Sequence, residues 1–291
     1  MALPKFDYIA AKSIDEACSA LAANPDGGKL IAGGVSLLRV MKFRIMSPDC
    51  LIDVKSIPGL RYIACSKDVL RIGATATSSD VLKSPDVERE FPLLSHAIAR
   101  IATTAVRNWA TVVGNICVGH TASDPSAALL VLDAELVIAS PSGERVLPIG
   151  EFFTGHMSTA LKEAELVREI RIPLRKEPTG MSYLAHAGRA AMETPLIAVG
   201  AALAGSDKKC TGASIALAGA AETPVRLSRA EQALVGGELN ERAIQNAASI
   251  AAEECAPDSD VYASAEYRRR LVGVYVRDAL RAAANRIGEA K

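Results

Sequence analysis

A pair of glycines, Gly33 and Gly34, separates a short apolar run from a run with helical spacing, and this junction strongly constrains the N-terminal fold. The apolar run covers residues 29–32 and reads as a strand. The run after the glycines repeats apolar residues at helical spacing, at Leu37, Leu38, Met41 and Ile45. Strand and helix signals alternate from residue 1 to about residue 55, and this alternation predicts an α/β unit.

Beyond residue 55 the pattern changes to paired strands with intervening helices. Strand pairs are predicted within residues 60–77, around a turn at residues 66–68, and in a hairpin that begins near residue 134. A strand is predicted over residues 166–173. Its last residue, Pro173, together with Pro178 and Gly180 marks a boundary near residues 174–180. A chain of 291 residues exceeds what one compact core usually serves. We therefore expect three parts, at residues 1–55, 56–175 and 176–291.

The third part opens with strand signals at residues 196–204 and 213–220 and ends in helices. In its last helical stretch Tyr267, Leu271 and Tyr275 fall on one face, while Arg268 and Arg269 are expected to reach solvent. At other helix starts, Ser13 with Glu16 is predicted to form a capping box, and Ser79 to cap a helix.

Composition and charge exclude some partners. Lys plus Arg and Asp plus Glu number 33 each, so the formal net charge is zero, and we expect no nucleic-acid partner. The sequence has no apolar run long enough to span a bilayer and no secretory signal, which predicts a cytoplasmic protein. The six cysteines and four histidines are widely spaced, so no intrinsic metal site is expected.

The first chemistry-bearing stretch is Ala32-Gly33-Gly34-Val35-Ser36, which lies between a predicted strand and a predicted helix. Glycines allow either positive φ or close approach of another group, which could be a neighbouring strand or a phosphate. Backbone N–H groups at a helix start can bind an anion, and Ser36 adds a hydroxyl donor. The spacing matches neither the Rossmann nor the P-loop motif, and a short glycine motif alone more often marks a structural turn.

The second stretch covers residues 103–136, and its presence favours a ligand-binding role over a purely structural turn. It is rich in small and hydrogen-bonding residues around one glycine, within Thr111-Val112-Val113-Gly114-Asn115, and could wrap a polyol or a diphosphate. Asp124 is suited to accept hydrogen bonds from sugar hydroxyls, although the Asp124-Pro125 pair also reads as a helix N-cap. Arg107 is interpreted as a structural salt-bridge partner.

These two motifs at this separation, with "CLIDVKSIPGL" after the first and "LLVLDAEL" after the second, resemble the FAD-binding medium subunit of the molybdenum hydroxylases. This family includes the flavoproteins of carbon monoxide dehydrogenase-like and xanthine dehydrogenase-like enzymes. The resemblance extends to "PKFDYIAAKSIDEA", "FFTG" and "LVREIRIP". It implies an α+β fold: a two-part FAD-binding domain of the vanillyl-alcohol-oxidase-like type, divided at residue 55, and a C-terminal domain with a sheet and helices.

The resemblance also implies the site. Residues Ala32, Gly33, Gly34, Val35 and Ser36 would hold the FAD diphosphate through backbone amides. A second flavin-binding loop would comprise Thr111, Val113, Gly114 and Asn115, and Asp124 would bind the ribityl or nearby hydroxyls. The resemblance implies no catalytic base and no metal ligand in this chain.

Function follows from the same resemblance. A large molybdopterin-binding subunit would oxidise the substrate, and a small iron–sulfur subunit with two two-iron clusters would relay electrons to FAD in this chain, within a dimer of heterotrimers. The alternatives are a self-contained FAD-dependent oxidoreductase of the vanillyl-alcohol-oxidase-like fold and a flavin-free scaffold protein.

The chain departs from the family pattern in two places. Val113-Gly114 stands where two glycines are frequent. In residues 183–195, Ala185 and Gly188 occupy usually basic positions, and Glu193 stands where Asp is common, so His186 and Arg189 alone keep the polar character.

Overall fold

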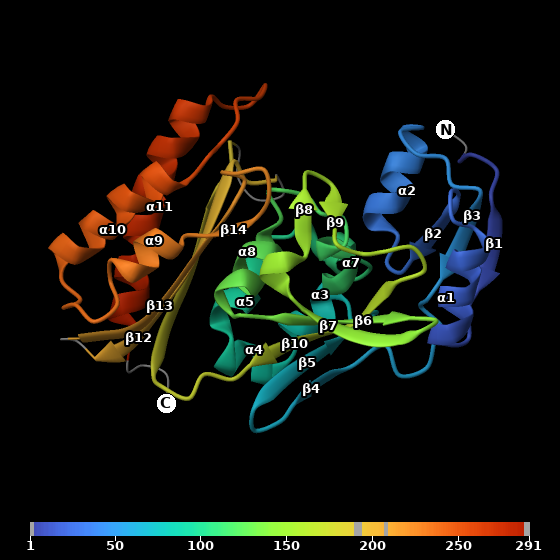
Figure 1. Ribbon diagram of the computed structural model, residues 1–291, viewed down its shortest axis with the longest axis horizontal. Coiled ribbons are helices and arrows are strands. Elements are labelled where there is room, and N and C mark those ends of the chain that lie inside the picture. Colours follow the sequence, from blue (N-terminus) through green and yellow to red (C-terminus); the bar gives the residue numbers. More distant parts are fainter. Residues whose placement is uncertain (1–2, 189–193, 207–208, 288–291) are drawn as a thin grey trace.

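The computed structural model describes residues 3–188, 194–206 and 209–287. Three larger sheets follow one another along the described part of the chain, with three, five and four strands, and a two-stranded sheet adjoins the second. Figure 1 shows them side by side in chain order, with the blue N-terminal part at one end and the orange C-terminal helices at the other. The α+β fold expected from the sequence is confirmed.

The N-terminal unit has the predicted order of strand, helix, strand, helix, strand. Its elements are β1 (Asp7–Ala10), α1 (Ile14–Ala23), β2 (Gly28–Ile31), α2 (Val35–Lys42) and β3 (Cys50–Asp53). The three strands are parallel in the order β1-β3-β2. Parallel strands end at the same edge of a sheet, so the turn after β2 and the end of β3 lie next to each other.

The central unit is built on an antiparallel sheet with the order β4-β5-β10-β6-β7. Its strands are β4 (Ile63–Cys65), β5 (Val69–Gly73), β6 (Glu135–Ser140), β7 (Gly143–Pro148) and β10 (Leu166–Pro173), with a small hairpin of β8 (Phe153–Gly155) and β9 (Ser158–Thr159). The helices are α3 (Ser78–Leu82), α4 (Pro85–Glu90), α5 (Pro92–Ala99), α6 (Thr104–Arg107), α7 (Val112–Ile116), α8 (Asp124–Val131) and the 3-10 turn η1 (Ile149–Glu151).

Ser13 is confirmed as a helix cap, whereas its capping box and two other predicted caps are corrected. Ser13 caps α1 by accepting from the Glu16 N–H, but the Glu16 carboxylate accepts from the N–H of Lys12 rather than that of Ser13, so the reciprocal box is absent. Helix α3 is capped by Thr77 in a full capping box with Asp80, and not by Ser79. At α8 the cap position is Ser123, because Asp124 already has helical geometry as the first residue.

The C-terminal unit is an antiparallel sheet flanked by helices. Its elements are β11 (Thr179–His186), β12 (Ile197–Ser206), β13 (Lys209–Ala218), β14 (Val225–Arg226), α9 (Ser228–Gln232), α10 (Glu241–Glu254) and α11 (Ala265–Asn285). Helices α10 and α11 cover one face of the sheet, and α8 and α5 of the central unit lie against the other (Figure 1). Gly180 permits the contact with α11, since a Cβ there would lie 1.9 Å from the Ala283 carbonyl oxygen.

The buried face of α11 agrees with the prediction in part, because Leu271 and Tyr275 are partly buried against the C-terminal core. Its inward residues are Val272, Val276, Ala279, Leu280 and Ala283. Tyr267, expected to be inward, is 45% exposed, whereas Arg268, expected in solvent, is only 6% exposed. Arg268 donates to the carbonyl of Gly219 and forms an ion pair with Asp260, which compensates the burial of its charge.

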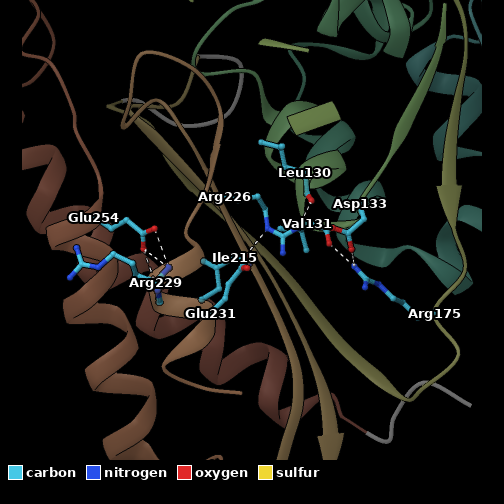
Figure 2. A network of polar contacts seen from close by, with 10 residues as sticks. Leu130, Val131, Asp133, Arg175, Ile215, Arg226, Arg229, Glu231 and Glu254 are labelled. Atoms are coloured by element: carbon cyan, nitrogen blue, oxygen red, sulfur yellow. Dashed lines mark hydrogen bonds and ion pairs between the residues drawn. The ribbon is translucent and has the colours of Figure 1, made fainter. Parts of the chain in front are cut away.

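Arginines join the central and C-terminal units at the end of α8 (Figure 2). Asp133, in a left-handed conformation, accepts from Arg175 at 2.9 Å and from Arg226 at 2.6 Å. The same arginines donate to the last carbonyls of α8, those of Val131 and Leu130. The positive charges thus meet the negative end of the helix dipole.

No helix among the described residues is long and apolar enough to cross a membrane.

Candidate functional site

The first glycine stretch forms the turn between β2 and α2. Gly34 occupies the N-cap position with φ of +70°, a left-handed conformation that favours glycine, and makes no side-chain cap. The first N–H groups of a helix have no intrahelical acceptor. Val35 and Ser36, in the first turn of α2, are exposed. The turn therefore presents backbone donors and one hydroxyl at the positive end of a helix.

Gly33 brings the two predicted loops into contact. A Cβ on Gly33 would lie 1.9 Å from the carbonyl oxygen of Trp109, so only glycine fits at this approach. Trp109 lies within the second stretch, two residues before Thr111, and is itself 64% exposed. Close packing of the Trp109 loop explains why position 33 is glycine. The left-handed backbone conformation explains why position 34 is glycine.

The second stretch is held by its own polar side chains. Thr111 caps α7 by accepting from the Gly114 N–H at 3.0 Å, and a Cβ on Gly114 would lie 2.6 Å from the Thr111 hydroxyl. Thr111 and Val113 are buried. The Asn115 side-chain oxygen accepts from the Ser123 hydroxyl at 2.8 Å, which ties this loop to the start of α8.

A third segment, residues 75–79, adjoins the second loop and was missed by the sequence analysis. The Ser78 N–H donates to the Ala110 carbonyl at 2.7 Å, and Thr77 pairs with Thr111 as an isolated bridge. The hydroxyls of Thr75 and Ser78 are buried without a hydrogen-bond partner among the described residues. The available signal was the run of small hydroxyl residues Thr75-Ala76-Thr77-Ser78-Ser79 after a predicted strand.

Asp124 is buried at the start of α8, with 9% of its surface exposed. Its Oδ1 accepts from the Tyr183 hydroxyl at 2.6 Å and lies 3.7 Å from Nε of Arg100. Burial raises the pKa of Asp124 to about 6, although the Tyr183 hydrogen bond and the Arg100 charge both act to lower it. Burial and the neighbouring carboxylate raise the pKa of Tyr183 well above its usual value.

The remaining polar residues singled out from the sequence are Arg107, His186, Arg189 and Glu193. Arg107 is structural as predicted, but its guanidinium donates to the carbonyls of Ala99, Ile101 and Ala102 and forms no ion pair among the described residues. Nδ1 of His186 lies 2.8 Å from the Tyr275 hydroxyl. Arg189 and Glu193 lie outside the described residues.

The arrangement fits a large ligand that carries both anionic and hydroxyl groups. The glycine turn offers helix-start donors, and the loop around Trp109 lies against it. The hydroxyls of Thr75 and Ser78 and Nε of Arg100 are buried polar atoms that have no hydrogen-bond partner in the described part of the chain, although Arg100 forms a 3.7 Å ion pair with Asp124. Buried polar atoms normally have hydrogen-bond partners, so such orphans indicate a missing ligand or water. Within residues 3–188, 194–206 and 209–287, no group of three or more metal-binding side chains could hold an ion.

Comparison with known proteins agrees with these features. The profile of the family described as "FAD binding domain in molybdopterin dehydrogenase" matches residues 4–175, and that of the "CO dehydrogenase flavoprotein C-terminal domain" matches residues 182–283. The carbon monoxide dehydrogenase medium chain of Hydrogenophaga pseudoflava is 35% identical over 280 residues, which are 96% of this chain and 97% of the relative. The xanthine dehydrogenase FAD-binding subunit of Escherichia coli O157:H7 is 32% identical over 267 residues, 91% of each chain.

Solved structures give the same result at the level of the fold. A structure of carbon monoxide dehydrogenase from Hydrogenophaga pseudoflava, which lacks the Mo-pyranopterin moiety of the molybdenum cofactor, superposes with a TM-score of 0.95 at 35% identity. The alignment covers 99% of this chain and 100% of that one. The chain therefore belongs to the family of FAD-binding medium subunits of the molybdenum hydroxylases, as the sequence motifs indicated.

Proposed function

We propose that this chain is the FAD-binding electron-transfer subunit of a molybdenum-containing hydroxylase or dehydrogenase. FAD is the cofactor, and its isoalloxazine supplies redox chemistry that accepts electrons singly and delivers them in pairs. The observation that carries the proposal is the contact of Gly33 with the Trp109 carbonyl, because it joins both motif-bearing loops into one site. Substrate oxidation belongs to a partner subunit, and this chain contributes no general base.

The residues of the chain bind and orient the cofactor. Ala32, Gly33, Gly34, Val35 and Ser36 would hold the diphosphate, since an uncapped helix start supplies N–H donors and a favourable dipole. Thr111, Val113, Gly114 and Asn115 would form the second loop. The Gly114 N–H already donates to the Thr111 hydroxyl, so the cofactor would be bound by the other backbone and side-chain groups of this loop. Asp124 would accept from cofactor hydroxyls.

The partners are proposed by the same reasoning. The relatives are named as medium chains or FAD-binding subunits, which places them in multi-subunit enzymes. We expect a large molybdopterin-binding subunit and a small iron–sulfur subunit with two two-iron clusters, assembled as a dimer of heterotrimers in the cytoplasm. Electrons would pass from those clusters to the flavin and then to an external acceptor.

Cofactor titration of the purified chain, freed of flavin, tests the proposal. FAD should bind at one per chain and give the flavin absorbance bands, and FMN, which lacks the second phosphate and the adenosine, should bind at least tenfold more weakly. Ser36→Ala should weaken FAD binding by about 0.5–1.5 kcal/mol for one lost hydrogen bond. Ser249→Ala, on the exposed side of α10, is the matched control and should leave affinity unchanged.

Equal affinity for FAD and FMN would contradict the diphosphate role. Turnover of a substrate by the chain alone would instead indicate a self-contained oxidoreductase.

A further inference from the structure

Asp124 is held by residues from two other elements, one of them in the C-terminal sheet. Tyr183 is on β11, and its hydroxyl donates to Oδ1 of Asp124 at 2.6 Å. Arg100 is the C-cap residue of α5, and its Nε lies 3.7 Å from the same oxygen. Both contacts therefore act on Oδ1, and neither involves Oδ2.

The second oxygen remains for a ligand. The Asp124 side chain is 11% exposed, and its neighbour Ser123 is hydrogen-bonded to Asn115 of the second loop. The carboxylate thus sits beside the loop proposed to bind flavin. Tyr183 is buried, so its hydroxyl has little access to water as an alternative acceptor.

We infer that Tyr183 and Arg100 are positioning residues that fix Oδ1 of Asp124 and keep the carboxylate ready to accept a hydroxyl of the cofactor through Oδ2. The inference rests on the proposed function, because it takes Asp124 as a flavin contact. It adds that the C-terminal sheet, which lies outside the FAD-binding domain, controls how strongly the cofactor is retained. Neither residue was assigned a role by the sequence motifs.

The charge of Asp124 links this positioning to pH. Burial favours the protonated acid, whereas the Tyr183 hydrogen bond and the Arg100 charge favour the carboxylate. Other titratable side chains that are charged or can become charged on elements packed against α8 include His96 on α5, Lys209 on β13, Arg226 on β14 and Glu151 in η1. Arg226 meets α8 at its opposite end, at the Leu130 carbonyl, and none of these four forms a hydrogen bond or ion pair with Asp124 among the described residues. Loss of Tyr183 or Arg100 should therefore raise the pKa of Asp124.

The test is the FAD dissociation constant of the full-length chain between pH 5 and 8. In the unaltered chain the affinity should fall as pH drops below about 6, where Asp124 takes up a proton. Tyr183→Phe should move this midpoint upward by roughly one pH unit, the value of one hydrogen bond to a charged group. Arg100→Gln should move it in the same direction. A merely structural role would lower the melting temperature and leave the midpoint in place.

Tyr62→Phe is the matched control, because the Tyr62 hydroxyl also bonds a buried carboxylate, that of Glu169, on the central sheet. It should leave the midpoint of FAD binding unchanged. Midpoints in Tyr183→Phe and Arg100→Gln that equal the unaltered one would overturn the inference. If Tyr183→Phe does not fold, the midpoint of Arg100→Gln alone decides.

Failure of the proposed function gives different results. Asp124→Asn should bind FAD more weakly than the unaltered chain and with no transition near pH 6. Unchanged affinity and an unchanged transition in Asp124→Asn would remove Asp124 from the cofactor site and overturn the inference with it. A chain that binds no FAD at any pH would contradict the proposed function itself.

Discussion

At the scale of single residues, the two glycines of the first turn have separate physical reasons. Gly33→Ala places a Cβ 1.9 Å from the Trp109 carbonyl oxygen, so the two loops must move apart. We expect a loss of about 1–3 kcal/mol in the free energy of unfolding, together with weaker FAD binding. Chemical denaturation and FAD titration of the same variant measure both effects.

Gly59→Ala is the control for backbone strain alone. Gly59 has φ of +78° and open space around it, so alanine there should cost about 1 kcal/mol of stability. It should not alter FAD affinity. If Gly33→Ala and Gly59→Ala behave alike in both measurements, the contact with Trp109 does not organise the site.

The burial of Asp124 predicts an unusual pH dependence of stability in the flavin-free chain. Its pKa is raised from 3.8 to about 6, so the folded state keeps a proton that the unfolded chain has already released. Stability from this group should therefore fall as pH rises from about 4 to 6, by roughly 2–3 kcal/mol. Thermal unfolding of Asp124→Asn between pH 4 and 7 should lack this decrease.

Glu165 provides the opposite case. The hydrogen bond from Arg145 is the main cause that lowers the pKa of Glu165, so its contribution is present above the unfolded pKa and is lost as pH falls. Glu165→Gln should therefore destabilise the chain at neutral pH.

For Asp124, the contradicting result is an identical slope of stability against pH in Asp124→Asn and the unaltered chain. That result would show that Asp124 does not titrate near pH 6.

At the scale of elements, the arginine network at the end of α8 holds the central and C-terminal units together (Figure 2). Arg226 donates to Asp133, Glu231 and the Leu130 carbonyl, and its side chain is largely buried. Arg226→Met removes one donor from each of these acceptors, although Asp133 keeps Arg175 and the Glu231 carboxylate keeps the Ile215 N–H, and it should cost about 1–3 kcal/mol, measured by urea denaturation.

Arg229 is the comparison in the same network. Its side chain pairs only loosely with the exposed Glu253, at 3.7 Å, while its backbone N–H keeps the contact with Glu254. Arg229→Met should therefore change stability by less than about 1 kcal/mol. If Arg226→Met and Arg229→Met lower the free energy of unfolding equally, the Arg226 network stabilises the chain no more than an exposed ion pair does.

Most elements could be predicted from the sequence because their signals are local. The N-terminal alternation, the turn at residues 66–68 and the strand β10 follow from apolar period and turn chemistry, and all are present. Caps were less predictable, because Thr77 and Ser79 are both suitable residues and only the chain path selects Thr77. Arg268 was misplaced because its carbonyl acceptors, such as Gly219, come from a distant loop that periodicity cannot reveal.

The site was predictable only in part for the same reason. The motif residues of the proposed site, Gly33, Gly34 and Gly114, are nominated by glycine spacing and family resemblance, and their role in cofactor binding stays a prediction. The partners of Asp124 could not be predicted, because Tyr183 lies 59 positions away on strand β11 of the C-terminal sheet. The contact of Gly33 with Trp109 likewise depends on tertiary packing and carries no sequence signal.

At the scale of the whole molecule, this chain carries electrons through FAD as one subunit of a larger enzyme. Relatives that share nearly its whole length are named as medium chains or FAD-binding subunits. A flavin that receives electrons from an iron–sulfur partner must lie near that partner, so a face of this subunit should be covered in the cell.

The most direct measurement is affinity purification of the tagged chain from its native cells, followed by flavin, molybdenum and iron analysis and mass spectrometry of the copurified proteins. We expect about one FAD per chain, with molybdenum, iron, and two further subunits, one large and one small. The flavin in this complex should be reduced when the enzyme's substrate is added, whereas FAD bound to the isolated chain should stay oxidised. Recovery of the chain alone, active and free of molybdenum and iron, would show that the proposed function is wrong.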